Sequence, residues 1–193
     1  MKRCDLKMEN LHSLGERELV ARLRKLLRRP SSVITEFEED SEIFSSKAKL
    51  AVTTELHGAG THFRNGNPET IGRRGVVSTL TDLLAKGALP EYFMTSIGLP
   101  RSTEYSFVEK LYKSMDDKLK SFDAYLIGGD TVESNQLFIS TVAIGKIKKK
   151  PLLRKNAKTG DKVVITGQIG NGALGYLMIK HGLTKPKKFI KAQ

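Results

Sequence analysis

Apolar residues recur at helical spacing in three stretches of this chain. From Gly15 to Arg29 the spacing predicts an amphipathic helix that Pro30 ends. The stretch Pro68–Gly87 opens with Pro and Glu and closes at glycine, so it predicts a buried helix. Thr103–Phe122 predicts a longer helix whose charged residues lie on the outer face.

Shorter apolar or alternating runs between these helices predict strands. They are Val33–Phe37, Lys49–Thr54, Tyr92–Leu99, Ala124–Ile127 and Gln136–Ile147. The last run alternates over enough residues to pair along its length with a neighbouring strand. This mixture, with 39% hydrophobic residues and 17 glycines, fits an α/β or an α+β protein and excludes neither.

The composition changes in the last quarter of the chain. Lys148–Gly160 has the composition of a linker. Beyond it, Lys162–Thr166 predicts a strand, Gly167–Gly172 a glycine-rich turn and Ala173–His181 a helix. The sequence therefore predicts a first domain over residues 1–147, a linker over 148–160 and the beginning of a second domain over 161–193.

The composition restricts the expected cellular location and the kinds of site that cysteine could form. No apolar run approaches the roughly 18 residues of a membrane span, and the first residues lack the apolar core of a signal peptide. A cytoplasmic protein without a membrane partner is the expectation. Cys4 is the only cysteine, which excludes an internal disulfide and a cluster of thiolate metal ligands.

The net charge of +12 is unevenly distributed. Residues 1–145 carry 20 basic and 20 acidic side chains, whereas residues 146–193 carry 13 basic ones and a single acid, Asp161. A solvated basic face explains this segment more simply than a surface for phosphates or RNA. Nucleic acid is therefore not the expected partner, although the second interpretation stays open.

The most suggestive chemistry lies in Ala124–Thr131, where an apolar run meets two glycines, Asp130 and a threonine. If the strand ends at the glycines, exposed N–H groups and the carboxylate could hold a cation against a phosphate, although Gly-Gly-Asp also makes ordinary turns. Further carboxylates are Asp40 in an acidic loop, Glu55 after a strand and Asp82 on an apolar helix. A buried carboxylate needs a partner, and Mg²⁺ supplies one.

Several motifs occur in the order found in one enzyme family. They are Leu19–Arg22, Glu39-Asp40, Thr53-Thr54-Glu55, Gly60-Thr61-His62-Phe63, Leu80–Leu83, Leu126–Thr131 and the segment from Arg154 to Asp161. Together they resemble the thiamine-monophosphate kinase family, in the superfamily of aminoimidazole ribonucleotide synthetase. The resemblance runs from about Leu14 to Leu183.

The resemblance implies an ATP-dependent transfer of phosphate to thiamine monophosphate, giving thiamine diphosphate. It implies an α+β fold with a mixed or antiparallel sheet, helices on one face, and a homodimer formed through this domain. Residues 161–193 would begin an incomplete C-terminal domain. The implied Mg²⁺ ligands are Asp40, Thr53, Thr54, Glu55, Asp82 and Asp130; Gly129, Asp130 and Arg154 would contact ATP, and His62 the substrate.

The chain departs from the family pattern at three positions. Glu38 replaces a glycine before the acidic pair, and Thr79 replaces an asparagine. Glu55 replaces an aspartate and is longer by one methylene, roughly 1.5 Å. With its short second domain, the chain alone is expected to have little kinase activity. The alternative is a non-catalytic relative that binds a nucleotide or a partner, with a basic C-terminal segment that contacts nucleic acid.

Overall fold

The computed structural model describes residues 10–28, 30–31, 47–63 and 66–183. The predicted strand Val33–Phe37 and the acidic loop with Asp40 lie outside these residues. The chain divides into two compact units, Met1–Leu152 and Leu153–Gln193, which are described separately.

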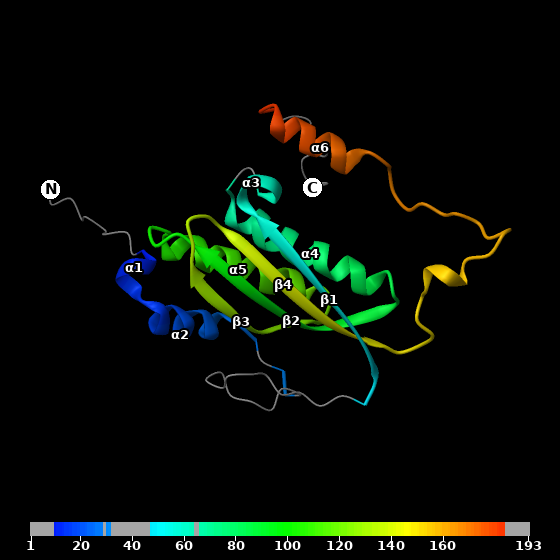
Figure 1. Cartoon of the computed structure of the whole chain (residues 1–193), viewed down its shortest axis with the longest axis horizontal. Coiled ribbons are helices and arrows are strands. Elements are labelled where there is room, and N and C mark those ends of the chain that lie inside the picture. Colours follow the sequence, from blue (N-terminus) through cyan, green and yellow to red (C-terminus); the bar gives the residue numbers. More distant parts are fainter. Residues whose placement is uncertain (1–9, 29, 32–46, 64–65, 184–193) are drawn as a thin grey trace. The chain divides into compact units, whose positions relative to one another are not determined.

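The first unit is built on a four-stranded sheet in the order β1-β4-β2-β3 (Figure 1). The strands are β1 (Lys49–Gly58), β2 (Ala88–Leu99), β3 (Tyr125–Glu133) and β4 (Phe138–Ile147). Strand β4 is antiparallel to both β1 and β2, whereas β2 and β3 are parallel. The sheet is therefore mixed, and the expected α+β fold is confirmed.

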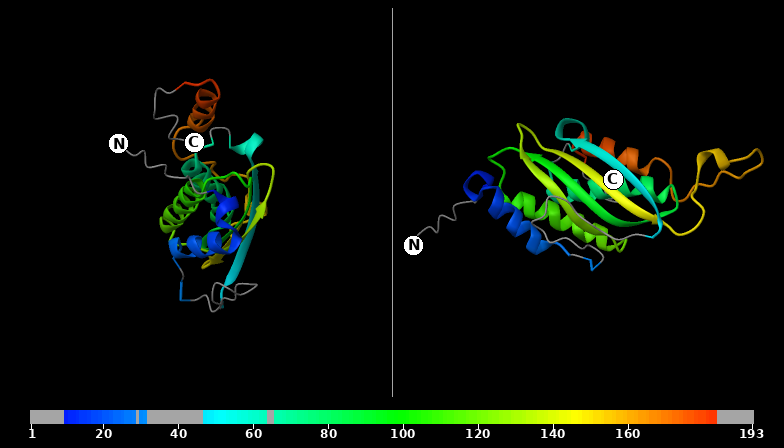
Figure 2. Two further views of the ribbon diagram at one scale, coloured as in Figure 1. Left: turned by 90° about the vertical axis from the view of Figure 1, so that its left-hand side faces the viewer. Right: turned by 60° about the horizontal axis from the view of Figure 1, so that its bottom comes forward.

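Helices cover one face of this sheet (Figure 2). They are α2 (Glu16–Leu26), α4 (Pro68–Leu84) and α5 (Tyr105–Lys120), with the short α1 (Leu11–Leu14) and α3 (Ala59–His62) at the edges. Helix α4 begins where the sequence predicts, because Pro68 occupies its first position and the Asn67 side chain accepts a hydrogen bond from Thr70 N at 3.1 Å.

The core lies between this helix layer and the sheet. Its largest fully buried side chains include Ile71, Val76, Leu80 and Leu83 of α4, Leu111, Met115 and Leu119 of α5, and Phe93, Ile97, Leu126 and Ile139 of the sheet. The opposite face of the sheet is open and partly apolar. Val52 and Leu56 of β1 are each 64% exposed on it, because alternate strand residues point to opposite faces.

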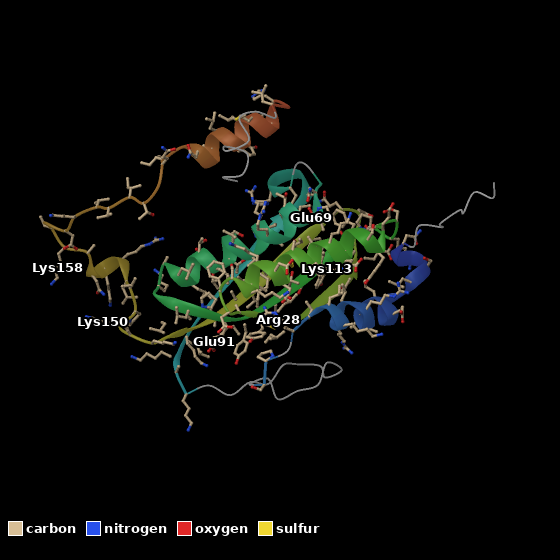
Figure 3. The ribbon with its side chains drawn as sticks, turned by 180° about the vertical axis from the view of Figure 1, so that it is seen from behind. Arg28, Glu69, Glu91, Lys113, Lys150 and Lys158 are labelled. Carbon is tan, nitrogen blue, oxygen red and sulfur yellow. The ribbon has the colours of Figure 1, made fainter. Side chains whose placement is uncertain are left out.

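The side chain of Arg28, labelled in Figure 3, connects the segment after α2 to the rest of the first unit through hydrogen bonds. Its Nε donates to Asp116 Oδ1 at 3.2 Å and its Nη2 donates to Ala124 O at 2.9 Å. The guanidinium also lies 4.7 Å from the ring centroid of Tyr125. Asp116 is buried and receives a second salt bridge, from Lys120 at 3.0 Å.

Strand β3 corrects a sequence prediction. The strand was expected to end at Ile127, but it continues through Gly128 and Asp130 to Glu133. The reason is the parallel partner β2, which pairs with it as far as Leu99 opposite Glu133. The Gly-Gly-Asp segment is therefore part of the sheet.

The second unit contains the 3-10 turn η1 (Arg154–Asn156) and the helix α6 (Asn171–Lys180). The predicted strand Lys162–Thr166 was wrong, since these residues form no regular structure and Val163 is 93% exposed. The β-branched run has strand propensity, yet no described strand pairs with it. None of the helices in the described residues has the length and hydrophobicity required to cross a membrane.

Candidate nucleotide and metal site

Thr53 and Asp82 form the best-defined part of the candidate site. Thr53 lies on the edge strand β1, and its Oγ1 donates a hydrogen bond to Asp82 Oδ2 of α4 at 3.1 Å. Asp82 is exposed, so the expectation of a buried carboxylate on this helix was wrong. Its helix position explains this, because it lies at the margin of the apolar face. The partner is a hydroxyl, and no salt bridge joins Asp82 to Arg73, Arg74 or another described cation.

The Thr53-Thr54-Glu55 segment presents its side chains to two faces. Thr53 and Glu55 are two residues apart in β1, so they share the face that looks toward α4. Thr54 lies on the other face, where its Oγ1 donates to Thr141 O at 2.9 Å. Thr53, Glu55 and Asp82 thus bring hydroxyl and carboxylate oxygens to one side of β1.

Asp130 lies at the opposite edge of the sheet. Strand register places it in a row with Ser96 of β2, Ser140 of β4 and Leu56 of β1. Three strand spacings separate β3 from β1, about 14 Å. Cross-strand neighbours share a face, so Asp130 lies on the open face with Leu56, and the structure does not bring it together with Thr53.

Asp130 is exposed, and its Oδ1 accepts a hydrogen bond from Thr131 N at 2.8 Å. Tyr112 of α5 lies on the helix side of β3, beside Thr131, the residue that follows Asp130. Burial raises the pKa of Tyr112 to about 12, its hydrogen bond with Thr131 opposes this rise, and the Asp130 charge adds to it. The phenol therefore stays neutral at physiological pH and supports β3 from below.

Gly129 has a packing role in this strand. A Cβ atom there would lie 1.9 Å from Thr95 O, so a side chain cannot be accommodated without moving β2. Arg154 lies in η1 of the second unit and is exposed, and Asp40 lies outside the described residues. Within the described residues, no group of three or more His, Cys, Asp or Glu side chains is arranged to hold a metal ion.

His62 lies at the end of α3. Its Nδ1 accepts a hydrogen bond from Gly58 N at 3.2 Å, which leaves Nε2 as the donor of a neutral ring. No pattern in the sequence connects it with another histidine. In the structure, its ring centroid lies 5.3 Å from that of His57, with the rings edge to face.

His57 was missed by the sequence analysis. It is 3% exposed, its Nε2 lies 3.0 Å from Ser78 Oγ, and its Nδ1 is buried without a hydrogen-bond partner among the described residues. Burial lowers the pKa of His57, and electrostatic repulsion from the neighbouring His62 and Arg74 lowers it further. The signal was available, because strand alternation places His57 on the face of Thr53 and Glu55, and Ser78 precedes Asp82 by one helical turn.

One known protein family matches the part of the chain that carries these side chains. Residues 38–147 match the N-terminal domain of AIR synthase related proteins. The chain belongs to this family. The match covers the whole sheet of the first unit together with α4 and α5, so it contains Thr53, Asp82, His57 and Asp130. The resemblance to this superfamily, predicted from the sequence motifs, is therefore confirmed.

Individual relatives are thiamine-monophosphate kinases. The enzyme of Prochlorococcus marinus is 33% identical over 190 residues, which are 93% of this chain and 55% of that protein. The crystal structure of thiamine-monophosphate kinase from Stenotrophomonas maltophilia matches with a TM-score of 0.75 and 26% identity, over 85% of this chain and 52% of that one.

A further structure, AaThiL complexed with AMPPCP and TMP, matches with a TM-score of 0.69 at 23% identity, over 95% of this chain and 59% of that one. This match supports the fold. The chain spans about half the length of the curated relatives it matches.

Proposed function

We propose that this chain carries the ATP- and Mg²⁺-binding part of a thiamine-monophosphate kinase and works in the cytoplasm. The observation that carries the proposal is the Thr53–Asp82 hydrogen bond, which joins two of the implied Mg²⁺ ligands at 3.1 Å. The kinase relatives and the ATP analogue bound to AaThiL support the same function.

In this proposal, Thr53, Glu55 and Asp82 supply oxygen ligands for Mg²⁺ on the face of β1 that looks toward α4. Asp40, Thr54 and Asp130 would supply ligands to further Mg²⁺ ions, because Thr54 and Asp130 lie on the open face of the sheet. Gly129, Asp130 and Arg154 would contact ATP, and His62 thiamine monophosphate. Bound Mg²⁺ would neutralise charge on the phosphate oxygens, which is the main requirement of phosphoryl transfer. The protein contributes the positioning: Thr53 orients Asp82, and the Gly58 amide orients the His62 ring.

We also propose that the chain forms a homodimer through the open face of its sheet. Val52 and Leu56 leave an apolar stripe on this face, which a second copy would remove from water. Asp130 belongs to the same face as Leu56 by register. A dimer would therefore enclose Asp130, which the single chain leaves in solvent.

We also propose that the chain binds nucleotide but catalyses phosphoryl transfer only weakly. The side chain of Glu55 is longer than the aspartate of the family pattern, and small misplacements of ligands are costly in a catalytic site. Robust turnover of thiamine monophosphate by the purified 193-residue chain would contradict this part of the proposal.

Calorimetric titration with ATP and Mg²⁺ tests the binding site. The wild-type chain is expected to bind, and Asp130→Asn to bind at least about tenfold more weakly, because a charge-assisted contact is lost. Glu133→Gln is the matched control, since Glu133 lies on the same strand but pairs with Arg101 at 2.6 Å. Wild-type binding that is absent, or equally weak in both variants, would overturn the proposal.

A further inference from the structure

A groove of about 500 Å³ lies between α4 and α5, away from the candidate nucleotide site. Glu69 and Lys113, which belong to its lining, are visible on the helix side of the molecule in Figure 3. The lining residues are Glu69 and Arg73 of α4 and Lys110, Lys113, Ser114, Asp117 and Lys118 of α5. A volume of this size is typical of a site for a small molecule, roughly 300–1,000 Å³.

The close approach of the two helices forms one wall of this groove. Gly72 lies so near α5 that a Cβ atom would fall 2.2 Å from Ser114 Oγ and 2.4 Å from Leu111 O. Ser114 Oγ donates to Leu111 O at 2.9 Å, which holds the hydroxyl in a fixed position beside Gly72. The groove is thus set by backbone packing as well as by mobile side chains.

Positive charge predominates in the lining, with four basic side chains against two carboxylates. Asp117 is already paired with Lys120 at 3.0 Å, and Lys113 with Glu109 at 2.8 Å. Arg73, Lys110 and Lys118, in contrast, make no salt bridge with any residue that the structure describes. Arg73 and Lys110 are therefore available to an anion, as is Lys118, whose Nζ lies 5.1 Å from the ring centroid of Phe122.

The chemistry of the lining restricts the class of ligand. None of the seven lining side chains is aromatic, so the groove offers no ring on which a nucleobase could stack. Lysine and arginine with one hydroxyl match phosphate oxygens. The carboxylates Glu69 and Asp117 would repel a long polyanion that passed through the groove, which favours a short ligand.

We propose that the α4–α5 groove binds a small, multiply charged phosphate compound, held by Arg73 of α4 and Lys110 of α5 across the groove. The ligand is a di- or triphosphate chain, free or carried on a small organic group. Lys113, Lys118 and Ser114 complete the contacts.

This site is separate from the candidate nucleotide site on the same helix. Arg74, Ser78 and Asp82 follow one another at successive turns of α4 and face β1, as the contacts of Ser78 with His57 and of Asp82 with Thr53 show. Arg73 is turned away from that row and lines the groove. The groove also needs no metal, because its cations contact phosphate directly.

Calorimetric titration with inorganic tripolyphosphate in EDTA tests the proposal, because EDTA removes metal-dependent binding. The wild-type chain and Asp130→Asn are expected to bind equally. The double variant Arg73→Ala/Lys110→Ala is expected to bind about tenfold more weakly, as two charge-assisted contacts are lost. Both residues lie on the helix surface, and thermal melts of the variants would verify that the fold is retained.

Arg74→Ala is the matched control, since it removes a neighbouring exposed arginine that does not line the groove. It should leave tripolyphosphate affinity within about twofold of the wild type, and salt at about 1 M should abolish binding in all variants. Equal losses in Arg74→Ala and the double variant would overturn the proposal, as would absence of wild-type binding. Tighter binding of a 20-residue RNA that is lost in the double variant would overturn the small-ligand assignment.

A parallel titration with ATP in EDTA separates a free phosphate chain from one carried on an organic group. If the phosphate chain is recognised, ATP and tripolyphosphate should compete and should lose affinity together in the double variant. Binding of ATP that is insensitive to the double variant assigns it to another site and contradicts the groove for nucleotides.

Discussion

Thr53 and Asp82 are joined by a hydrogen bond of 3.1 Å between the edge strand β1 and the second half of α4. Two candidate ligands are therefore oriented by the contact between the strand and the helix. Such preorganisation lowers the entropic cost of binding a ligand. The pair also gives the helix layer a polar contact to the outermost strand of the sheet.

The strength of this contact is measurable by a double-mutant cycle. Thr53→Val, Asp82→Ala and their combination should show a coupling of about 0.5–1.5 kcal/mol in the free energy of unfolding, because each single change breaks the same bond. Urea unfolding without Mg²⁺ is the measurement. The cycle with Thr54→Val in place of Thr53→Val is the control and should show no coupling, since Thr54 bonds Thr141 O instead. Equal coupling in both cycles would mean that the contact is not specific.

Two glycines of α4 should respond in opposite ways to alanine. Gly72→Ala is expected to destabilise the fold by about 1–3 kcal/mol, because the new methyl group would overlap Leu111 O, a backbone atom that cannot rotate away. At Gly75 the nearest atom to a Cβ is 3.8 Å away, so Gly75→Ala should be neutral or stabilise by up to about 1 kcal/mol through helix propensity. Thermal or urea unfolding distinguishes them, and similar effects at both positions would contradict the close α4–α5 packing.

Two arginine–carboxylate pairs differ in burial and should differ in energetic weight. Arg28→Ala should destabilise by about 1–3 kcal/mol, because Asp116 is buried and loses one of its two cations. Arg101→Ala removes a pair whose side chains are 64% and 58% exposed, and should cost less than about 1 kcal/mol. The comparison uses the midpoint of urea unfolding. A larger loss at Arg101 would show that burial does not determine the contribution.

Acidification should destabilise the fold through His57. Its folded pKa lies below the ordinary value of 6.5, so the unfolded chain takes up a proton that the folded chain does not. Stability is therefore intact above pH 6.5 and falls as the pH drops, by up to about 1.4 kcal/mol per pH unit for this one proton. His57→Gln removes the group, and its free energy of unfolding should fall less steeply between pH 7 and 5. Parallel profiles for the two proteins would exclude His57 as the cause.

Local patterning predicts most of the elements correctly. Pro68 and Asn67 mark the start of α4, and its apolar spacing identifies the face that becomes the core. The end of β3 was missed because pairing with β2 extends that strand, and pairing is a long-range property. The strand predicted over Lys162–Thr166 does not form, because strand propensity without a partner strand does not make a strand.

The candidate site was predicted less completely than the fold. Strand alternation shows that Thr53 and Glu55 share a face, but only the tertiary fold shows that Asp82 meets Thr53 and that Asp130 lies three strands away on the other face. His57 was overlooked because its neighbours, Ser78 and His62, come from other elements. Contacts between elements depend on packing angles that no local pattern contains.

The sheet order has a consequence for how the protein is made. Of the four described strands, β4 is the last to be synthesised, yet it lies between β1 and β2, and its contacts with β1 include residues 87 apart along the chain. Closing so long a loop is entropically costly and makes folding slow. During synthesis, β1 would remain without a pairing partner until β4 left the ribosome. Thr53 would then reach its place beside α4 in the same late step that completes the sheet.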